Sequence, residues 1–166
     1  WGDEPDVGLD APAAAAPTSG VALPPPLPEF ERTELGTRWY ELVCKCNEAS
    51  SLVALVRELA MQAELIQCAA DGDGGQTWTL RVARETLRNP TLVDKLAAAM
   101  RVHVGAGLKL AVVAGEAQDS PTKRDAAEAD RRQREAIAAV QSDPTVRALL
   151  AQFRTARILP GSIKPL

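Results

Sequence analysis

The chain has 166 residues, of which 46% are hydrophobic and 4% aromatic, and its formal net charge is −3. This length suffices for one globular domain with flanking segments, and so small a net charge produces no overall field that attracts nucleic acid. The charge is uneven, because residues 1–34 contain seven acidic side chains and one arginine, a local −6 that leaves +3 on the remainder. This distribution favours a protein partner, with at most weak DNA contact.

Residues 1–34 form an acidic segment rich in proline and alanine. A segment of this composition cannot bury enough apolar surface to offset the entropy of ordering it, so we expect a disordered, extended linker. Its proline-rich run, residues 23–28, could instead be a ligand for a small recognition module. The chain starts without methionine and without the basic and apolar regions of a signal peptide, which indicates a fragment of a longer protein.

A globular domain is expected over residues 35–154. Thr37 can cap its first helix, in which one apolar stripe consists of Trp39, Leu42, Val43 and Cys46. Ser50 or Ser51 can cap a second helix, whose stripe consists of Leu52, Leu55, Val56, Leu59 and Ala63.

Two strands joined by a tight turn should follow, at residues 64–70 and 76–83. In the second of them Trp78, Leu80 and Val82 alternate with polar residues, which is typical of a half-buried strand. The glycine-rich connection at residues 71–75 starts like a calcium loop, but the glycine which that loop needs at its sixth position is absent. A hairpin turn is therefore the better interpretation.

The second half of the domain alternates again between helix and strand. Residues 89–91 open a third helix, with Thr91 as its cap and an inward face of Leu92, Leu96 and Met100. A third strand at residues 108–114, a polar loop at 115–122 and a charged helix at 122–141 come next. That helix carries i,i+4 pairs typical of a solvated helix rather than of catalytic carboxylates, namely Glu128–Arg132 and Asp130–Arg134.

The expected element order, α-α-β-β-α-β-α-α, predicts an α+β fold in which helices pack on a small three-stranded sheet. The first two strands form an antiparallel hairpin, and the third is reached by a right-handed crossover if it runs parallel. This order resembles a K-homology (KH-like) layout. That fold binds single-stranded nucleic acid through a Gly-x-x-Gly loop, whereas the corresponding turn here, residues 46–50, has no glycine.

The last two dozen residues combine a short helix with an apolar tail. Asp143 is a natural N-cap and Pro144 suits the first helical position, and the helix has the apolar stripe Val146, Leu149, Leu150 and Phe153. The tail, residues 155–166, retains four apolar side chains between prolines that forbid a regular helix, namely Ile158, Leu159, Ile163 and Leu166. Such a tail either packs back on its own domain or binds a partner.

This terminus resembles the end of the tau subunit of bacterial DNA polymerase III. The resemblance lies in Asp-Pro-x-Val-x-x-Leu-x-x-x-Phe from Asp143 and in the final Ile-Leu-Pro-Gly-Ser-Ile-Lys-Pro-Leu from Ile158, and a looser likeness extends over residues 38–166. It implies a bacterial, cytoplasmic domain that binds the polymerase alpha subunit and ties it to the clamp loader. The partner-binding residues would then be Phe153, Arg157, Ile158, Leu159, Ile163, Lys164, Pro165 and Leu166.

We expect no enzyme in this segment. It contains no P-loop motif, so the ATPase of a clamp-loader subunit would lie upstream. No serine or cysteine has an evident base partner.

We expect neither a metal nor a cofactor. Cys44 and Cys46 are two residues apart on a helix and point in different directions, and His103 is the only histidine. Three cysteines, an odd number, favour free thiols in a reducing compartment, and the isolated domain should be a monomer.

The alternative function is a KH-like module that binds single-stranded nucleic acid. Six arginines near the end of the chain could form a basic stripe, namely Arg131, Arg132, Arg134, Arg147, Arg154 and Arg157. Few aromatic side chains are available for bases to stack on, however.

No apolar run reaches the roughly 18 residues of a membrane span, so we expect no membrane contact.

Overall fold

The computed structural model describes residues 25–165 except 73, 154 and 160. The greater part of the predicted linker, residues 1–24, lies outside the described residues. Contacts divide the described chain into two compact units, residues 25–132 and residues 133–165. The predicted division of the chain at residues 34 and 154 stays a prediction.

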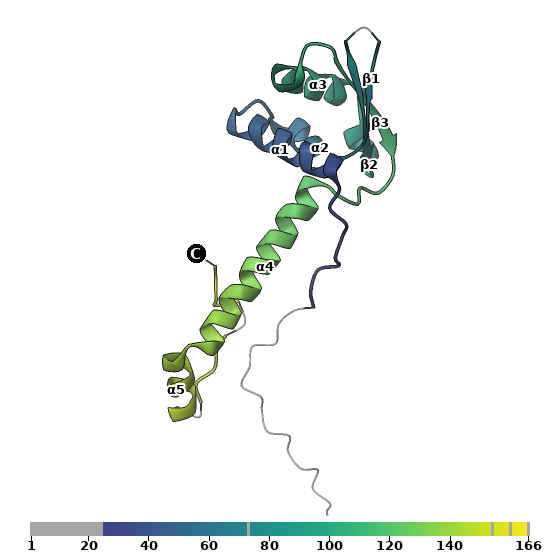
Figure 1. The fold of residues 1–166 in the computed structure, drawn as a ribbon. Helices are drawn as coiled ribbons and strands as arrows, with labels where there is room; N and C mark the ends of the chain where they lie inside the picture. Colours follow the sequence, from purple (N-terminus) through teal and green to yellow (C-terminus); the bar gives the residue numbers. More distant parts are fainter. Residues whose placement is uncertain (1–24, 73, 154, 160, 166) are drawn as a thin grey trace, which may run out of the picture. The chain divides into compact units, whose positions relative to one another are not determined.

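The described residues form an α+β fold (Figure 1), and the predicted class and order of helices and strands are confirmed. One short 3-10 helix, η1, was not predicted. The elements are α1 (Glu34–Glu48), α2 (Ala54–Gln62), β1 (Glu64–Ala70), β2 (Gln76–Val82), η1 (Glu85–Arg88), α3 (Pro90–Val104), β3 (Leu108–Ala114), α4 (Pro121–Ser142) and α5 (Pro144–Gln152).

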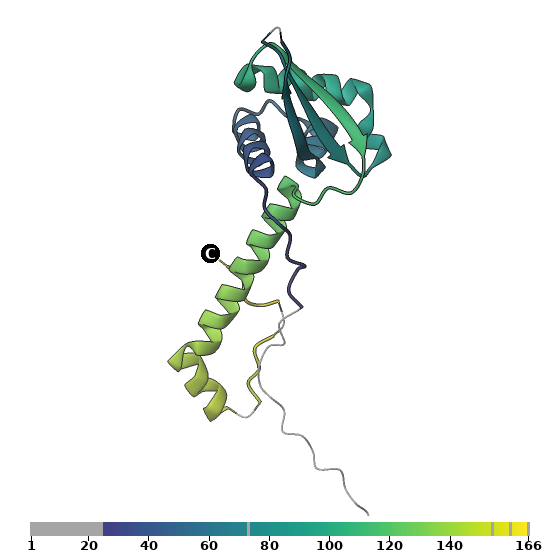
Figure 2. The same ribbon diagram turned by 45° about the vertical axis from the view of Figure 1, so that its right-hand side comes forward.

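The sheet belongs to residues 25–132 and has the order β1-β2-β3. β1 and β2 form the predicted antiparallel hairpin, while β3 runs parallel to β2, with α3 in the crossover between them. Leu80 of β2 lies opposite Leu65 on one side and Val112 on the other. Helices α1, α2 and α3 lie on the same face of the sheet, which leaves its other face open (Figure 2).

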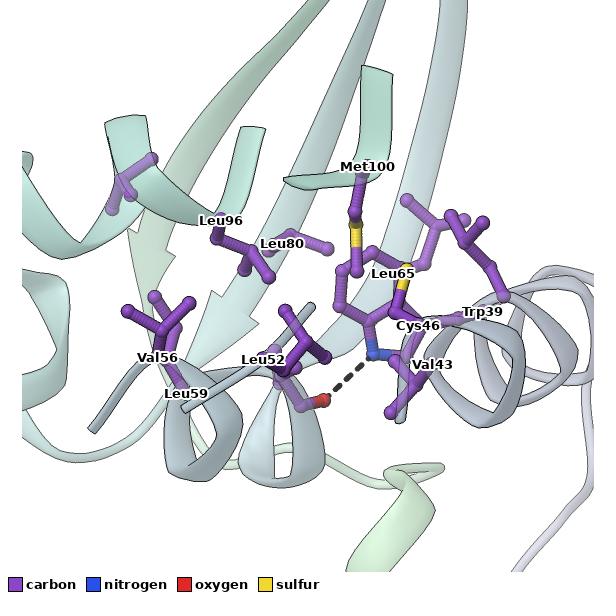
Figure 3. Packing of buried hydrophobic residues seen from close by; sticks show 14 of the residues in the cluster. Trp39, Val43, Cys46, Leu52, Val56, Leu59, Leu65, Leu80, Leu96 and Met100 are labelled. Atoms are coloured by element: carbon purple, nitrogen blue, oxygen red, sulfur yellow. Dashed lines mark hydrogen bonds between the residues drawn. The ribbon is translucent and has the colours of Figure 1, made fainter. Parts of the chain in front are cut away.

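The hydrophobic core lies between this sheet and the three helices (Figure 3). Its largest side chain, Trp39, is fully buried, and its indole Nε1 donates a hydrogen bond of 3.0 Å to the carbonyl oxygen of Ala60, which joins α1 to α2. The predicted inward faces of the helices are largely confirmed. Leu55 is the exception, because 54% of its side chain is exposed and Ala60 occupies the core in its place.

The predicted caps of α1 and α3 are wrong by a few residues. The side chain of Thr33, not Thr37, caps α1 by accepting a hydrogen bond from the backbone N–H of Gly36. Thr37 lies one turn further on and donates to the carbonyl oxygen of Thr33. Asn89, not Thr91, caps α3, because its extended backbone lets its side chain accept the N–H of Thr91.

The predicted cap of α2 is also wrong. Neither Ser50 nor Ser51 caps this helix, which begins at Ala54 without a side-chain cap. Ser50 adopts a left-handed conformation with φ of 53° and closes the turn that ends α1. Leu52 is buried in the core before α2 begins, and the extended residue Val53 leads into the helix.

The loop between β3 and α4, predicted to be merely polar, holds a buried carboxylate. Asp119 is fully buried and accepts two hydrogen bonds from the Arg124 guanidinium, at 2.6 and 2.7 Å. It also accepts the backbone N–H of Thr33 at 2.7 Å and the Thr33 hydroxyl at 3.1 Å. One carboxylate therefore joins the start of α1, the loop after β3 and the first turn of α4.

Gly36 is required by this arrangement. A Cβ atom at residue 36 would lie 2.0 Å from Oδ2 of Asp119, well inside van der Waals contact. The helix can approach the carboxylate this closely only because glycine has no side chain.

We predict that Asp119→Ala destabilises residues 25–132 by about 3–5 kcal/mol, because it leaves the buried Arg124 guanidinium without its counter-charge. The free energy of unfolding from urea titrations of the two proteins measures this loss. Glu116→Gln is the matched control, since the Glu116 side chain is 77% exposed and lies 3.8 Å from Lys123. Its effect should stay below about 1 kcal/mol, and equal losses in the two variants would contradict a special role for Asp119.

Stability should also fall at acid pH through the same carboxylate. Burial of Asp119 opposes its ionisation, but the hydrogen bonds from Arg124 and Thr33 outweigh this effect and place the pKa of Asp119 below its ordinary value of 3.8. A lowered pKa in the folded state stabilises the protein above the unfolded pKa, and this stabilisation is lost as the pH falls from about 4 toward the folded pKa. Urea titrations over that range should show a smaller loss in Asp119→Ala than in the parent chain.

Candidate functional site

The short helix α5 begins where the sequence predicts. The carboxylate of Asp143 accepts the backbone N–H groups of Thr145 at 2.7 Å and Val146 at 3.1 Å, and Pro144 occupies the first turn. These hydrogen bonds from Val146 and Thr145 lower the pKa of Asp143. The cap fixes the direction in which α5 leaves the end of α4.

The apolar stripe of α5 is only partly covered. Val146 and Leu150 are half-buried, whereas Leu149 is 49% exposed and Phe153, just after the helix, is 54% exposed. No residue of this helix is buried. Two of the four side chains of the stripe are therefore about half exposed, which is unusual for a helix that only supports a core.

The tail runs back along the second half of α4 (Figures 1 and 2). The side-chain amide of Gln133 donates a hydrogen bond of 2.8 Å to the carbonyl oxygen of Ile163. Ile137, one turn further along α4, is 5% exposed, and Ile158 and Ile163 are half-buried. Two of the four predicted tail anchors are thus partly covered within residues 133–165.

The remaining predicted site residues point outward or cannot be placed. Leu159 is 69% exposed, which leaves it free for contact with another molecule. Phe153, Arg157, Lys164 and Pro165 are exposed as well, and Leu166 lies outside the described residues. Among the described residues of this unit, the large apolar side chains that are exposed are Leu149, Phe153 and Leu159.

The terminal part of the chain carries a net positive charge. Residues 133–166 contain five basic and two acidic side chains, a net +3. Arg147, Arg157 and Lys164 are exposed and form no ion pair with any described residue. This unit thus exposes both apolar and basic side chains, and protein-binding surfaces contain both kinds.

The predicted basic stripe is partly neutralised by its own helix. Arg131 and Arg132 both pair with Glu128, at 2.6 and 2.9 Å, which also confirms the predicted Glu128–Arg132 pair. Arg154 lies outside the described residues. Both described tryptophans are buried, so neither presents a face on which a base could stack.

The three cysteines are free thiols. Cys46 is buried in the core, and burial raises its pKa, whereas Cys44 and Cys68 are half-buried. Within the described ranges no group of three or more His, Cys, Asp or Glu side chains is placed to hold a metal ion. His103 is exposed at the end of α3.

Sequence reasoning missed Gln133 as the residue that holds the tail. A glutamine in a charged helix carries no local signal, because its acceptor lies 30 residues further along the chain. The apolar stripe predicts Leu149 on one face of α5, but it does not predict that this side chain is 49% exposed.

Comparison of the chain with protein-family models, with curated proteins and with solved structures finds no match. Among the helices that the structure describes, none combines the length and the apolar character needed to cross a bilayer. The candidate site is therefore interpreted from its own geometry and from the resemblance of its terminus.

The hydrogen bond from Gln133 generates a prediction about the tail. Gln133→Ala should destabilise the position in which residues 155–165 lie against α4 by about 1 kcal/mol. This corresponds to a roughly fivefold shift toward states in which the tail is detached from α4. Heteronuclear NOE values of these backbone amides should fall, while residues 25–132 melt at the same temperature. Gln152→Ala, at an exposed position at the end of α5, is the control, and an unchanged tail in Gln133→Ala would contradict the role of this bond.

Proposed function

We propose that the chain is a non-catalytic protein–protein interaction domain, and that α5 and the tail bind the alpha subunit of bacterial DNA polymerase III. The observation that carries the proposal is the exposure of three large apolar side chains, Leu149, Phe153 and Leu159, within one short terminal unit. The same unit contains Arg147, Arg157 and Lys164, which are exposed and form no ion pair with any described residue. Exposed apolar surface marks a binding site where it is contiguous, and the proposal takes these side chains to form one surface.

The size of the apolar surface suits tight binding. Full burial of a Leu or Phe side chain contributes about 1.5–3 kcal/mol, so three of them provide several kcal/mol before the cost of association. Ordering of flexible chain reduces such gains. The bond from Gln133 and the half-buried positions of Ile158 and Ile163 already restrict the tail, which lowers that cost.

The identity of the partner rests on the resemblance of the terminus to the tau subunit. In this proposal the terminal unit holds the polymerase, while the acidic segment that precedes Thr33, the cap of α1, gives reach toward the rest of the clamp loader. A flexible connection of this kind can keep a bound partner at about millimolar local concentration. The domain would then act in chromosomal replication in the bacterial cytoplasm, with the ATPase of its parent upstream.

The competing hypothesis, a KH-like module for single-stranded nucleic acid, has less support. Two of its arginines share Glu128, and the turn between α1 and α2 has no glycine to let a phosphate backbone approach. DNA contact in the assembly would be weak and would fall steeply with salt.

The proposal predicts that the exposed apolar residues determine binding. Phe153→Asp with Leu159→Asp should weaken binding to the polymerase alpha subunit by several kcal/mol, because both side chains would be buried in the complex. Truncation after Thr155 should have an equal or larger effect. Isothermal titration calorimetry of the purified proteins measures the affinity, and the melting temperature of residues 25–132 should stay nearly constant.

Val102→Asp is the matched control, since Val102 is apolar and 80% exposed but belongs to α3. It should leave the affinity unchanged. Undiminished binding by the truncated chain would show that the anchors lie elsewhere. If the parent chain did not bind the polymerase alpha subunit, the proposed identity of the partner would be refuted.

A further inference from the structure

A polar pocket opens between three elements of the domain formed by residues 25–132. It has a volume of about 400 Å³ and is bordered by α1, the start of β2 and the end of α3. Its polar lining consists of Arg38, Glu41, Lys45, Gln76 and His103, with Trp78 at its base. These side chains come from three distant parts of the sequence, and the proposed tether uses none of them.

Arg38 is held over this base. The centre of its guanidinium lies 4.9 Å from the ring centroid of Trp78, which is a cation–π contact. No carboxylate of the described residues lies within ion-pair distance of Arg38. Its N–H groups therefore remain available to an acceptor from solution.

Gln76 is oriented by the same tryptophan. The indole Nε1 of Trp78 donates a hydrogen bond of 3.0 Å to Oε1 of Gln76. This bond occupies the acceptor end of the amide, so its NH₂ group remains a donor. Trp78 is itself 1% exposed and cannot stack on a base or sugar.

The charge of the pocket is positive. Arg38 and Lys45 contribute two positive charges and Glu41 one negative charge, which gives +1 with His103 neutral. Glu41 lies one turn from each cation but forms no ion pair with either among the described contacts. A single carboxylate cannot hold a metal ion, whereas the donors of Arg38, Lys45, Gln76 and His103 all suit an anion.

We propose that this pocket binds a phosphate group. A tetrahedral phosphate presents oxygens in several directions and can accept hydrogen bonds from donors on α1, β2 and α3 together. A planar carboxylate offers only two oxygens in one plane. The group could come from a small phosphate ester or from the backbone of a single strand, and both sources share this chemistry.

The experiment is an NMR titration of the full chain with inorganic phosphate, thymidine monophosphate and a ten-residue oligothymidylate, each at constant ionic strength. We expect saturable shifts of the Trp78 indole and Gln76 amide signals. Tighter binding of the monophosphate indicates a small ester, and tighter binding of the oligonucleotide indicates a strand. No saturable shift with any of the three would overturn the proposal.

Two substitutions at exposed positions test the electrostatics in opposite directions. Lys45→Gln should weaken phosphate binding about threefold, and Glu41→Gln should strengthen it about threefold, the size expected of single exposed charges. Lys95→Gln, at an exposed position of α3 outside the pocket, is the control. If Lys45→Gln and Lys95→Gln weakened phosphate binding equally, the effect would come from the overall charge of the protein. That result would contradict binding in this pocket.

Discussion

The arrangement of residues 25–132 depends on the buried pair of Asp119 and Arg124. Removing two charges from water costs several kcal/mol per ion, so such a pair persists only when the remaining lone pairs and protons are also satisfied. Here Thr33 donates twice to Asp119, while Arg124 also donates to the carbonyl oxygen of Thr33 and the hydroxyl of Thr37. The cap of α1 and the start of α4 are consequently parts of one polar cluster. Loss of either Asp119 or Arg124 leaves the other as a buried charge without a counter-charge.

Features that depend on neighbouring residues could be predicted from the sequence. The alternation of Trp78, Leu80 and Val82 with polar residues predicts β2, and Asp143 followed by Pro144 predicts the start of α5, because each signal is complete within one turn or strand. The glycine-rich connection likewise predicts the hairpin. The parallel direction of β3 was left open, since either direction can present the same apolar face to the helices.

Features that depend on distant residues could not be predicted. Thr33 and Asp119 are 86 residues apart, so neither the true cap of α1 nor the burial of this loop has a local signal. Leu55 is 54% exposed although it was expected on the same face as Leu52, because Leu52 precedes α2, which begins only at Ala54, and therefore does not follow the helical period. Periodicity identifies apolar faces, and tertiary contacts decide which of their residues are covered.

The same limit applies to the candidate site. The apolar residues between prolines predict that the tail packs against its own domain or against a partner. They do not predict which of its side chains face the domain and which face outward. Gln133 holds the carbonyl oxygen of Ile163 and brings that isoleucine beside α4, whereas Leu159 stays exposed. Ile158 and Ile163 are half-buried, whereas Leu159 and Phe153 are exposed. A binding segment that is held in place before it meets its partner loses less entropy on association than a free one. In the proposed complex the inward isoleucines would therefore contribute to affinity without touching the partner.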